Sequence, residues 1–190
     1  MFPIEAFQKT LAKAVAIFER HDIGFHLTGG LTSILYGEPR MTQDIDIVVD
    51  NPAIAVEVEA FLGSLASSDF LFDTASIRQA IASRGMFQLF DTVEALKLDI
   101  YPRELVPGEL QRSQYVEVFA GVRLPVVSRA DAAISKLIWI SHGSHKSRRD
   151  FRHIFRAAPA ADQALIGNLA AQLGLGPLLN EVLNEPDEIA

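Results

Sequence analysis

The chain contains no cysteine and no long apolar run. Without cysteine it cannot form a disulfide scaffold, a thiolate metal site or a cysteine nucleophile, which agrees with a reducing compartment. No apolar stretch approaches the roughly 20 residues that a membrane-spanning helix needs. The first residues, MFPIEAFQKT, also lack the basic segment and apolar segment of a secretory signal. The sequence therefore predicts a soluble, cytoplasmic protein without membrane contact.

Negative charge is in excess: the 190 residues carry 17 Lys and Arg against 24 Asp and Glu, a formal net charge of −7. This balance argues mildly against a protein that coats nucleic acid, because phosphate binding depends on Lys and Arg. Residues 136–156 are different, since six basic residues there accompany one acid and leave a local charge of +5. They are Lys136, Lys146, Arg148, Arg149, Arg152 and Arg156, with Asp150 as the acid. Such a segment suits docking of a polyanion such as tRNA, and a solvated helix face is an equal interpretation.

Hydrophobic periodicity predicts strands mainly in the middle of the chain and helices at its end. Helices are predicted over residues 4–20, 31–37, 52–66 and 76–83, and strands over residues 25–28, 44–50, 86–91, 95–102 and as a pair within 116–128. The helix over 52–66 is expected to have Asn51 as its N-cap and Pro52 at its first position. From Ser128 onward the pattern is helical. This distribution predicts an α+β core followed by a helical C-terminal part.

Asp44 and Asp46 stand two positions apart in the strand over 44–50, so both carboxylates project from one face. Asp99 lies on the polar face of the strand over 95–102. Each aspartate alone is best interpreted as a solvated residue, but Asp is depleted in strands and three are hard to explain by packing. If the two strands are neighbours, the three carboxylates converge. Oxygen ligands without cysteine or clustered histidine favour magnesium or manganese.

Gly29 and Gly30 lie between the strand over 25–28 and the helix after it. Two glycines let the backbone approach a ligand closely, and the N–H groups at a helix N-terminus favour an anion such as a triphosphate. Many such turns use glycine for steric reasons alone. Here 13 residues separate Gly30 from Asp44, about enough for a short helix and a return to the next strand. The spacing therefore places the glycines and the carboxylates at the same end of two adjacent strands.

The stretch HLTGGLTSILYGEPRMTQDIDIVVD resembles the signature of DNA polymerase β-type nucleotidyltransferases, and its fuller pattern is similar to the AbiE-type (AbiEii) toxin nucleotidyltransferases. The resemblance spans most of residues 15–155 and is most specific over 29–46. It implies an α+β fold in which a mixed β-sheet is flanked by helices. We expect a nucleotidyltransferase core over residues 1–127 and a helical region over residues 128–190.

The resemblance also implies roles for single residues. Gly29 and Gly30 match the turn that contacts the nucleotide phosphates. Asp44 and Asp46 match the metal-binding pair, and Asp99 matches the third acid, which helps to hold the catalytic metal and activates the incoming hydroxyl.

Further residues match the phosphate-binding part of the family pattern. Lys136 resembles the later lysine that reaches the triphosphate, and Asp150 resembles the acid that follows it. Arg40, four residues before the acidic pair, is expected to offset phosphate charge together with Lys136. The second residue of the turn is commonly serine and is glycine here, so Thr32 or Ser33 would supply the hydroxyl.

The implied activity is the magnesium- or manganese-dependent transfer of a nucleoside monophosphate from an NTP to a hydroxyl group, with release of pyrophosphate. The acceptor would be an RNA 3′ end such as that of tRNA, and the chain would be the toxin of a toxin–antitoxin pair with a cognate antitoxin protein. Two alternatives stay open: nucleotidylation of a small antibiotic, and a non-catalytic nucleotide-binding module that has kept the fold.

Overall fold

The computed structural model describes residues 4–38 and 44–186. Contacts group the chain into two compact units. The sheet unit lies within residues 1–31 and 41–127, and the helical unit lies within residues 32–40 and 128–190. The division into domains at residues 127 and 128 stays a prediction, and each unit is described by itself below.

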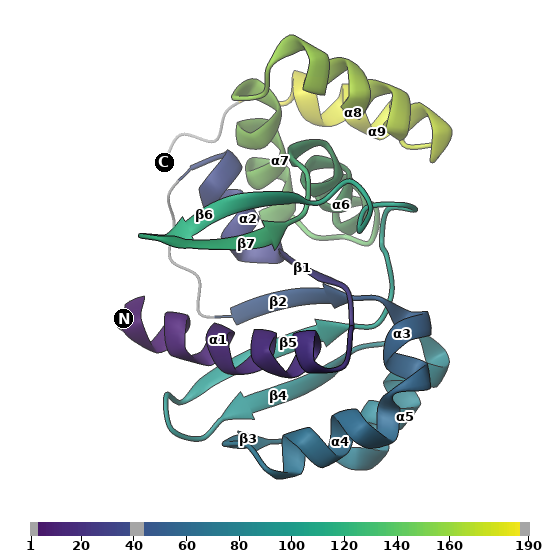
Figure 1. The fold of residues 1–190 in the computed structure, drawn as a ribbon. Coiled ribbons are helices and arrows are strands. Elements are labelled where there is room, and N and C mark those ends of the chain that lie inside the picture. Colours follow the sequence, from purple (N-terminus) through teal and green to yellow (C-terminus); the bar gives the residue numbers. More distant parts are fainter. Residues whose placement is uncertain (1–3, 39–43, 187–190) are drawn as a thin grey trace. The chain divides into compact units, whose positions relative to one another are not determined.

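The sheet unit is built on seven strands in the order β3-β4-β5-β2-β1-β7-β6 (Figure 1). The strands are β1 (Phe25–Thr28), β2 (Asp44–Val49), β3 (Phe70–Leu71), β4 (Phe87–Asp91), β5 (Leu96–Tyr101), β6 (Gln114–Phe119) and β7 (Val122–Val126). The pairs β2–β5 and β1–β7 are parallel, and the other neighbours are antiparallel. The predicted α+β class with a mixed sheet is confirmed.

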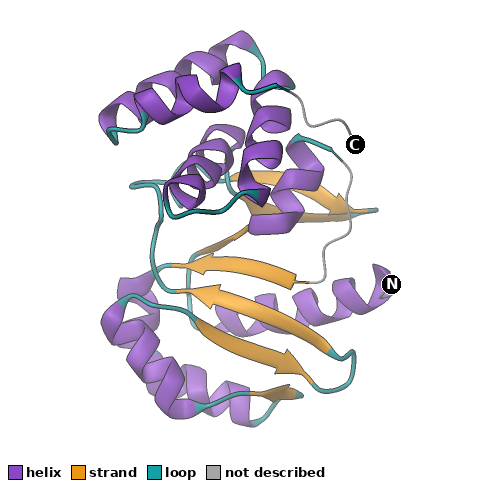
Figure 2. Cartoon of the chain, turned by 180° about the vertical axis from the view of Figure 1, so that it is seen from behind, coloured by secondary structure: helices purple, strands orange, loops and turns teal. Residues whose placement is uncertain are grey.

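Helices cover one face of strands β2, β5 and β4, as the two opposite views in Figures 1 and 2 show. The helices of this unit are α1 (Ile4–Arg20), α3 (Asn51–Val56), α4 (Val58–Ala66) and α5 (Thr74–Ser83). Phe18 of α1 stacks on Phe61 of α4 with ring centroids 6.1 Å apart, and Phe61 meets the edge of Phe87 of β4 at 6.3 Å. All three rings are buried, so they fasten the helices to the sheet.

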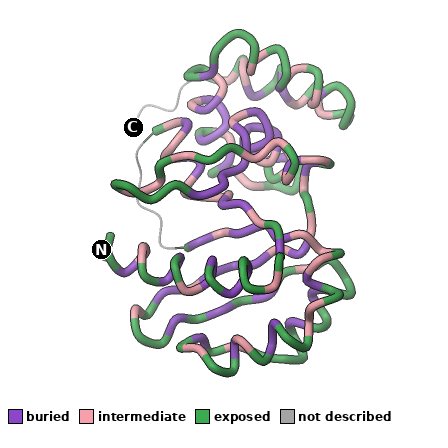
Figure 3. The backbone as a smooth tube through the Cα atoms, in the orientation of Figure 1, coloured by how far each residue is buried: buried purple, intermediate pink, exposed green. Residues whose placement is uncertain are grey.

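Burial alternates along β4 and along the first residues of β2, and the tube in Figure 3 shows the buried stretches of the sheet. In β2 the apolar residues Ile45 and Ile47 are buried, whereas Asp44 is exposed and Asp46 is half-buried. Because side chains alternate between the faces of a strand, the helix-covered face takes the apolar residues and the opposite face takes the carboxylates. The alternation of apolar and acidic residues in the sequence therefore determines which face of the sheet carries the aspartates.

The helical unit consists of α6 (Arg129–Ser141), α7 (Lys146–Arg156), α8 (Ala160–Gln172), α9 (Gly176–Asn184) and the part of α2 (Gly29–Tyr36) from Thr32 onward. Ser128 is the N-cap of α6, because its Oγ accepts a hydrogen bond from the Asp131 N–H at 3.1 Å. No helix formed by the described residues is both long and apolar enough to cross a membrane.

The predicted helix over residues 52–66 is wrong in two details. The structure has two helices there, α3 and α4, and the helical conformation is interrupted at Glu57 between them. The N-cap is Asp50, whose Oδ1 accepts from the Ala53 N–H at 3.3 Å. Asn51 instead donates its side-chain amide to the Ile81 carbonyl oxygen at 3.4 Å. Asp50 has extended backbone angles, as an N-cap requires, whereas Asn51 is already helical.

We expect Asp50→Ala to lower the free energy of unfolding by about 1 kcal/mol, because the first turn of α3 loses its side-chain cap. Asp50→Ser keeps an acceptor at this position and should recover most of the loss. Urea unfolding of the three proteins measures both values. Equal destabilisation by the Ala and Ser variants would contradict the capping role.

Candidate active site

The three aspartates predicted from the sequence lie on two adjacent strands, on the face of the sheet opposite the helices of the sheet unit. β2 and β5 are neighbours in parallel register, with Asp46 opposite Asp99 and Asp44 opposite Lys97. Residues opposite each other on paired strands share a face, so the carboxylates of Asp46 and Asp99 lie side by side. The two strands are therefore adjacent, as convergence of the carboxylates requires.

Asp46 lies against the start of helix α2. Its Oδ2 accepts a hydrogen bond from the Gly30 N–H at 3.4 Å, and its Oδ1 accepts from the Tyr101 hydroxyl at 3.3 Å. Burial raises the pKa of Tyr101 above its usual range, and the nearby charge of Asp46 adds to the effect. The phenol therefore stays protonated and keeps donating to Asp46.

Gly29 makes this approach of Asp46 sterically feasible. It adopts φ +67°, a left-handed conformation that favours glycine. A Cβ atom at this position would lie 1.9 Å from Asp46 Oδ2. The diglycine thus does bring the backbone close to a charged group, and in this structure that group is the carboxylate of Asp46.

Asp99 is the most buried of the three acids, with a side chain that is 11% exposed. Its Oδ1 accepts from the Gln88 side-chain amide at 2.9 Å, and its Oδ2 accepts from Lys97 Nζ at 3.0 Å. Lys97 Nζ also lies 3.4 Å from Asp44 Oδ1. The hydrogen bond to Asp99 raises the pKa of Lys97, so its ammonium group stays charged.

The donor set of this face fits a divalent cation. Three carboxylates on two adjacent strands supply hard oxygen ligands, which magnesium and manganese prefer. The ammonium group of Lys97 contacts two of them, which shows that the cluster accommodates positive charge. Among the described residues, no group of three or more His, Cys, Asp or Glu side chains is already drawn together as a metal centre.

A second cluster of predicted site residues lies within the helical unit. Lys136 Nζ is 3.1 Å from Asp150 Oδ2, and both side chains are about nine-tenths buried. Ser33 Oγ donates to the same carboxylate at 2.9 Å. Ser33, one of the two residues expected to supply a hydroxyl to phosphate, is thus bonded to Asp150 here. Thr32 is buried, and Arg40 lies outside the described residues.

Sequence reasoning missed three side chains that hold the acids in place: Gln88, Lys97 and Tyr101. The alternation in β5 already placed Lys97 and Tyr101 on the face of Asp99, so a signal for both was present. Gln88 had no such signal, because its position opposite Asp99 depends on the register of the β4–β5 pair.

The basic residues of α7 are largely paired with carboxylates of their own unit. Arg148 contacts Glu181 at 2.9 Å and also Glu185. Arg152, which is 4% exposed, contacts Glu185 at 2.6 Å. Arg149 likewise pairs with Glu38 at 2.8 Å. Three acids distant along the chain thus offset part of the local charge of +5 counted from the sequence, which favours the structural interpretation of these arginines.

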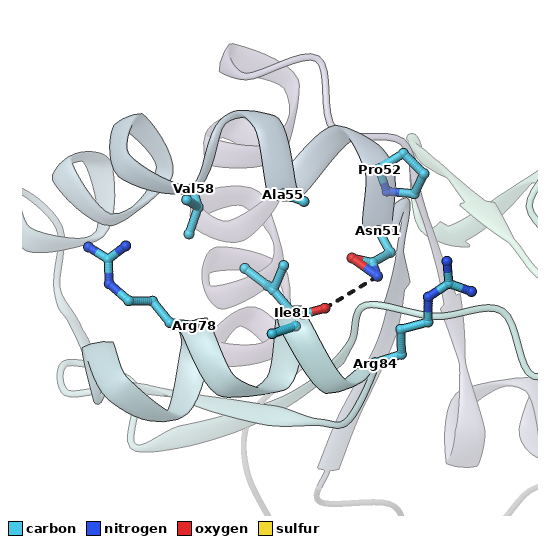
Figure 4. Close-up of a pocket in the computed structure, with 8 residues that line it drawn as sticks. Asn51, Pro52, Ala55, Val58, Arg78, Ile81 and Arg84 are labelled. Atoms are coloured by element: carbon cyan, nitrogen blue, oxygen red, sulfur yellow. Dashed lines mark hydrogen bonds between the residues drawn. The ribbon is translucent and has the colours of Figure 1, made fainter.

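The sheet unit contains two neighbouring cavities that share Asn51, Pro52 and Arg84 in their linings. The first has a volume of about 540 Å³ and lies between α3 and α5, with Arg78 and Arg84 at its two ends (Figure 4). The second, of about 660 Å³, is lined by Arg84 and Arg103 among others. Arg78 is paired with Glu59 at 2.8 Å. Arg84 and Arg103 have no carboxylate partner among the described residues.

Two solved structures share the fold. The solution structure of the antibiotic-resistance factor ANT(2″)-Ia aligns with a TM-score of 0.60 at 14% identity, over 95% of this chain and 99% of that one. A putative nucleotidyltransferase from Thermotoga maritima aligns with a TM-score of 0.51 at 21% identity, over 80% and 94%. None of the curated proteins compared with the chain matches it. Both likenesses, at 14% and 21% identity, show a shared fold.

The family model described as nucleotidyl transferase AbiEii toxin, type IV toxin–antitoxin system, matches residues 12–165. The chain belongs to this AbiEii family, and the resemblance seen in the sequence is confirmed. The roles of the single site residues stay predictions.

We expect Gly29→Ala to displace the Asp46 carboxylate and to destabilise the protein by about 1–2 kcal/mol, because a left-handed conformation and a steric clash coincide. Gly63→Ala is the matched control, since Gly63 lies in α4 with no atom within 4 Å of the added Cβ, and it should be neutral or slightly stabilising. Urea unfolding compares the two. A Gly29→Ala protein as stable as wild type would contradict this account of the turn.

Proposed function

We propose that this protein transfers a nucleoside monophosphate from an NTP to an acceptor hydroxyl in a reaction that depends on magnesium or manganese. The observation that carries the proposal is the parallel register that sets Asp46 beside Asp99, with Asp44 two residues along the same face. Membership of the AbiEii family supports the reaction class. The metal ion, when bound, supplies a Lewis acid that lowers the pKa of the attacking hydroxyl and neutralises charge on the phosphates.

The three acids would hold the metal, and their surroundings determine how they do so. Gln88 fixes Asp99 by a hydrogen bond to Oδ1, which leaves Oδ2 as the oxygen directed towards cations. Tyr101 and the Gly30 N–H orient Asp46 in the same way. Asp99 is also the group we assign to receive the proton of the attacking hydroxyl, because it is the most buried acid of the three.

For the helical unit, the proposal rests on the family resemblance. Lys136 would offset negative charge on the triphosphate, and Asp150 would hold the ammonium group in position through their ion pair. Arg40 and Thr32 are proposed phosphate contacts on the same ground. Because Ser33 donates to Asp150, we assign it a supporting role in this ion pair as well.

Asp46→Asn and Asp99→Asn should each lower NMP transfer by at least about 100-fold, because the metal ion that would neutralise the phosphates loses a carboxylate ligand while side-chain volume is kept. Asp22→Asn is the control: Asp22 is exposed in the turn between α1 and β1 and has a positive φ that Asn tolerates. The assay follows label from α-labelled NTP into pools of RNA, protein and small acceptors. Wild-type protein that binds NTP and metal but transfers no label to any pool would favour a non-catalytic module.

For the acceptor, we propose an RNA 3′ end such as that of tRNA, modified by a toxin that is paired with an antitoxin. The family description supports the toxin role and an antitoxin partner. The cavity with Arg84 and Arg103 supports a phosphate-bearing acceptor, since two arginines without carboxylate partners among the described residues line one hollow of an acidic protein.

The position of Arg84 strengthens this interpretation. It is the C-cap of α5 and adopts φ +53°, where glycine would relieve about 1 kcal/mol of strain. The two carboxylates in the same lining are engaged by backbone N–H groups. Asp50 caps α3, and Glu104 accepts from Gly108 and Leu110, both at 2.9 Å. Because these carboxylates already accept hydrogen bonds from the backbone, the two arginines are the groups of this lining that would donate to a bound phosphate.

Replacing Arg84 and Arg103 by Gln should raise the KM for the RNA acceptor. In a plot of the logarithm of the RNA-binding constant against the logarithm of the salt concentration, the slope should become shallower by about one for each lost phosphate contact. The KM for NTP should stay unchanged. Arg20→Gln, which removes an exposed charge from α1, is the control. Unchanged RNA kinetics together with efficient transfer to an antibiotic would favour the small-molecule alternative.

A further inference from the structure

Lys97 is a cation placed inside the acid cluster by the strand itself. It precedes Asp99 by two residues in β5 and stands opposite Asp44 of β2. Its Nζ lies 3.0 Å from Asp99 Oδ2 and 3.4 Å from Asp44 Oδ1, so one ammonium group bridges carboxylates from two strands. These are two of the three acids proposed as metal ligands.

The electrostatics of the face explain why a cation is needed there. Asp46 and Asp99 are direct neighbours across the β2–β5 pair, and two like charges at such a distance repel each other by several times the thermal energy in a half-buried site. Lys97 offsets part of this repulsion. Without this ammonium group, the carboxylates would repel each other more strongly until a metal ion bound.

The ammonium group and the carboxylates differ in mobility. Asp99 is held by Gln88 at 2.9 Å and its side chain is 11% exposed, so its position is fixed. Lys97 reaches the cluster on a flexible four-carbon stem, and its side chain is 36% exposed. The carboxylates can therefore stay in place while the ammonium group leaves.

We propose that Lys97 is a resident counter-ion that occupies the metal-binding carboxylates before the substrate arrives, competes with the free divalent cation for Asp44 and Asp99, and moves onto the nucleotide phosphates when the metal binds. In taking the acids as metal ligands, this inference rests on the proposed function. Its consequence is an order of binding: free metal binds weakly, and the metal–nucleotide complex binds well because its phosphates receive the displaced ammonium group.

The test uses Lys97→Met, which keeps the length of the side chain and removes its charge. Binding of Mn²⁺ alone, followed by its paramagnetic resonance signal, should be about tenfold tighter than in wild type, because one competing charge a few ångströms away is lost. Binding of a non-hydrolysable NTP analogue in the presence of saturating Mn²⁺ should weaken several-fold, because its phosphates lose a partner. Without metal, the variant should also unfold at a lower temperature and recover when Mn²⁺ is added.

Two control variants complete the design. Lys9→Met removes an exposed lysine of the same unit, which pairs with Glu94 at 3.3 Å, and so measures the effect of net charge alone. Asp46→Asn measures whether Mn²⁺ binds at the cluster.

The outcomes separate the two proposals. If Mn²⁺ binding requires Asp46 but Lys97→Met changes it no more than Lys9→Met does, the counter-ion inference is overturned and the metal site stands. If Asp46→Asn binds Mn²⁺ as wild type does, or if neither wild type nor Lys97→Met binds it, the metal site fails and the inference fails with it. Opposite changes in the affinity for free Mn²⁺ and for the nucleotide analogue support the inference.

Discussion

The parallel pairing of β2 with β5 is the constraint on which the site depends. Residues 44–49 and 96–101 are separated by three helices and two strands along the chain, and the register alone sets Asp46 beside Asp99. A shift by one residue would turn either strand over and bury its polar side chains under the helices. The phenylalanines and isoleucines of the opposite face oppose that shift, so packing on one face fixes the chemistry on the other.

Once the carboxylates are brought together, much of the local structure compensates their charge. Each acid is met by different partners: a backbone N–H and a phenol for Asp46, an amide and an ammonium group for Asp99, and the same ammonium group for Asp44. The neutral donors orient the acids and cannot replace a cation. Lys97 is the cation that contacts Asp44 and Asp99, the same carboxylates that a metal ion would bind.

The sequence was sufficient for properties set by local pattern and insufficient for those set by register and long-range pairing. Helix α1 begins and ends as predicted at Ile4 and Arg20, because a strong 3.6-residue period leaves little alternative. The predicted N-cap of α3, Asn51, lies one residue after the observed one, since Asp50 and Asn51 are equally good caps and the backbone angles decide between them. The two-residue strand β3 was too short to show a period. Gln88 and the ion pairs of α7 depend on contacts between distant segments.

The ion pairs of α7 also change how the net charge of −7 is understood. Arginines that contact Glu38, Glu181 and Glu185 serve the packing of their own unit, and a buried arginine such as Arg152 requires its carboxylate there. A count of charges along the sequence cannot distinguish arginines that are paired with carboxylates inside the protein from arginines that are not. Among the described residues, Arg84 and Arg103 line a cavity without a carboxylate partner, and the sequence does not set them apart. For an acidic enzyme that handles phosphates, the cations without an internal carboxylate partner are more informative than the most clustered ones.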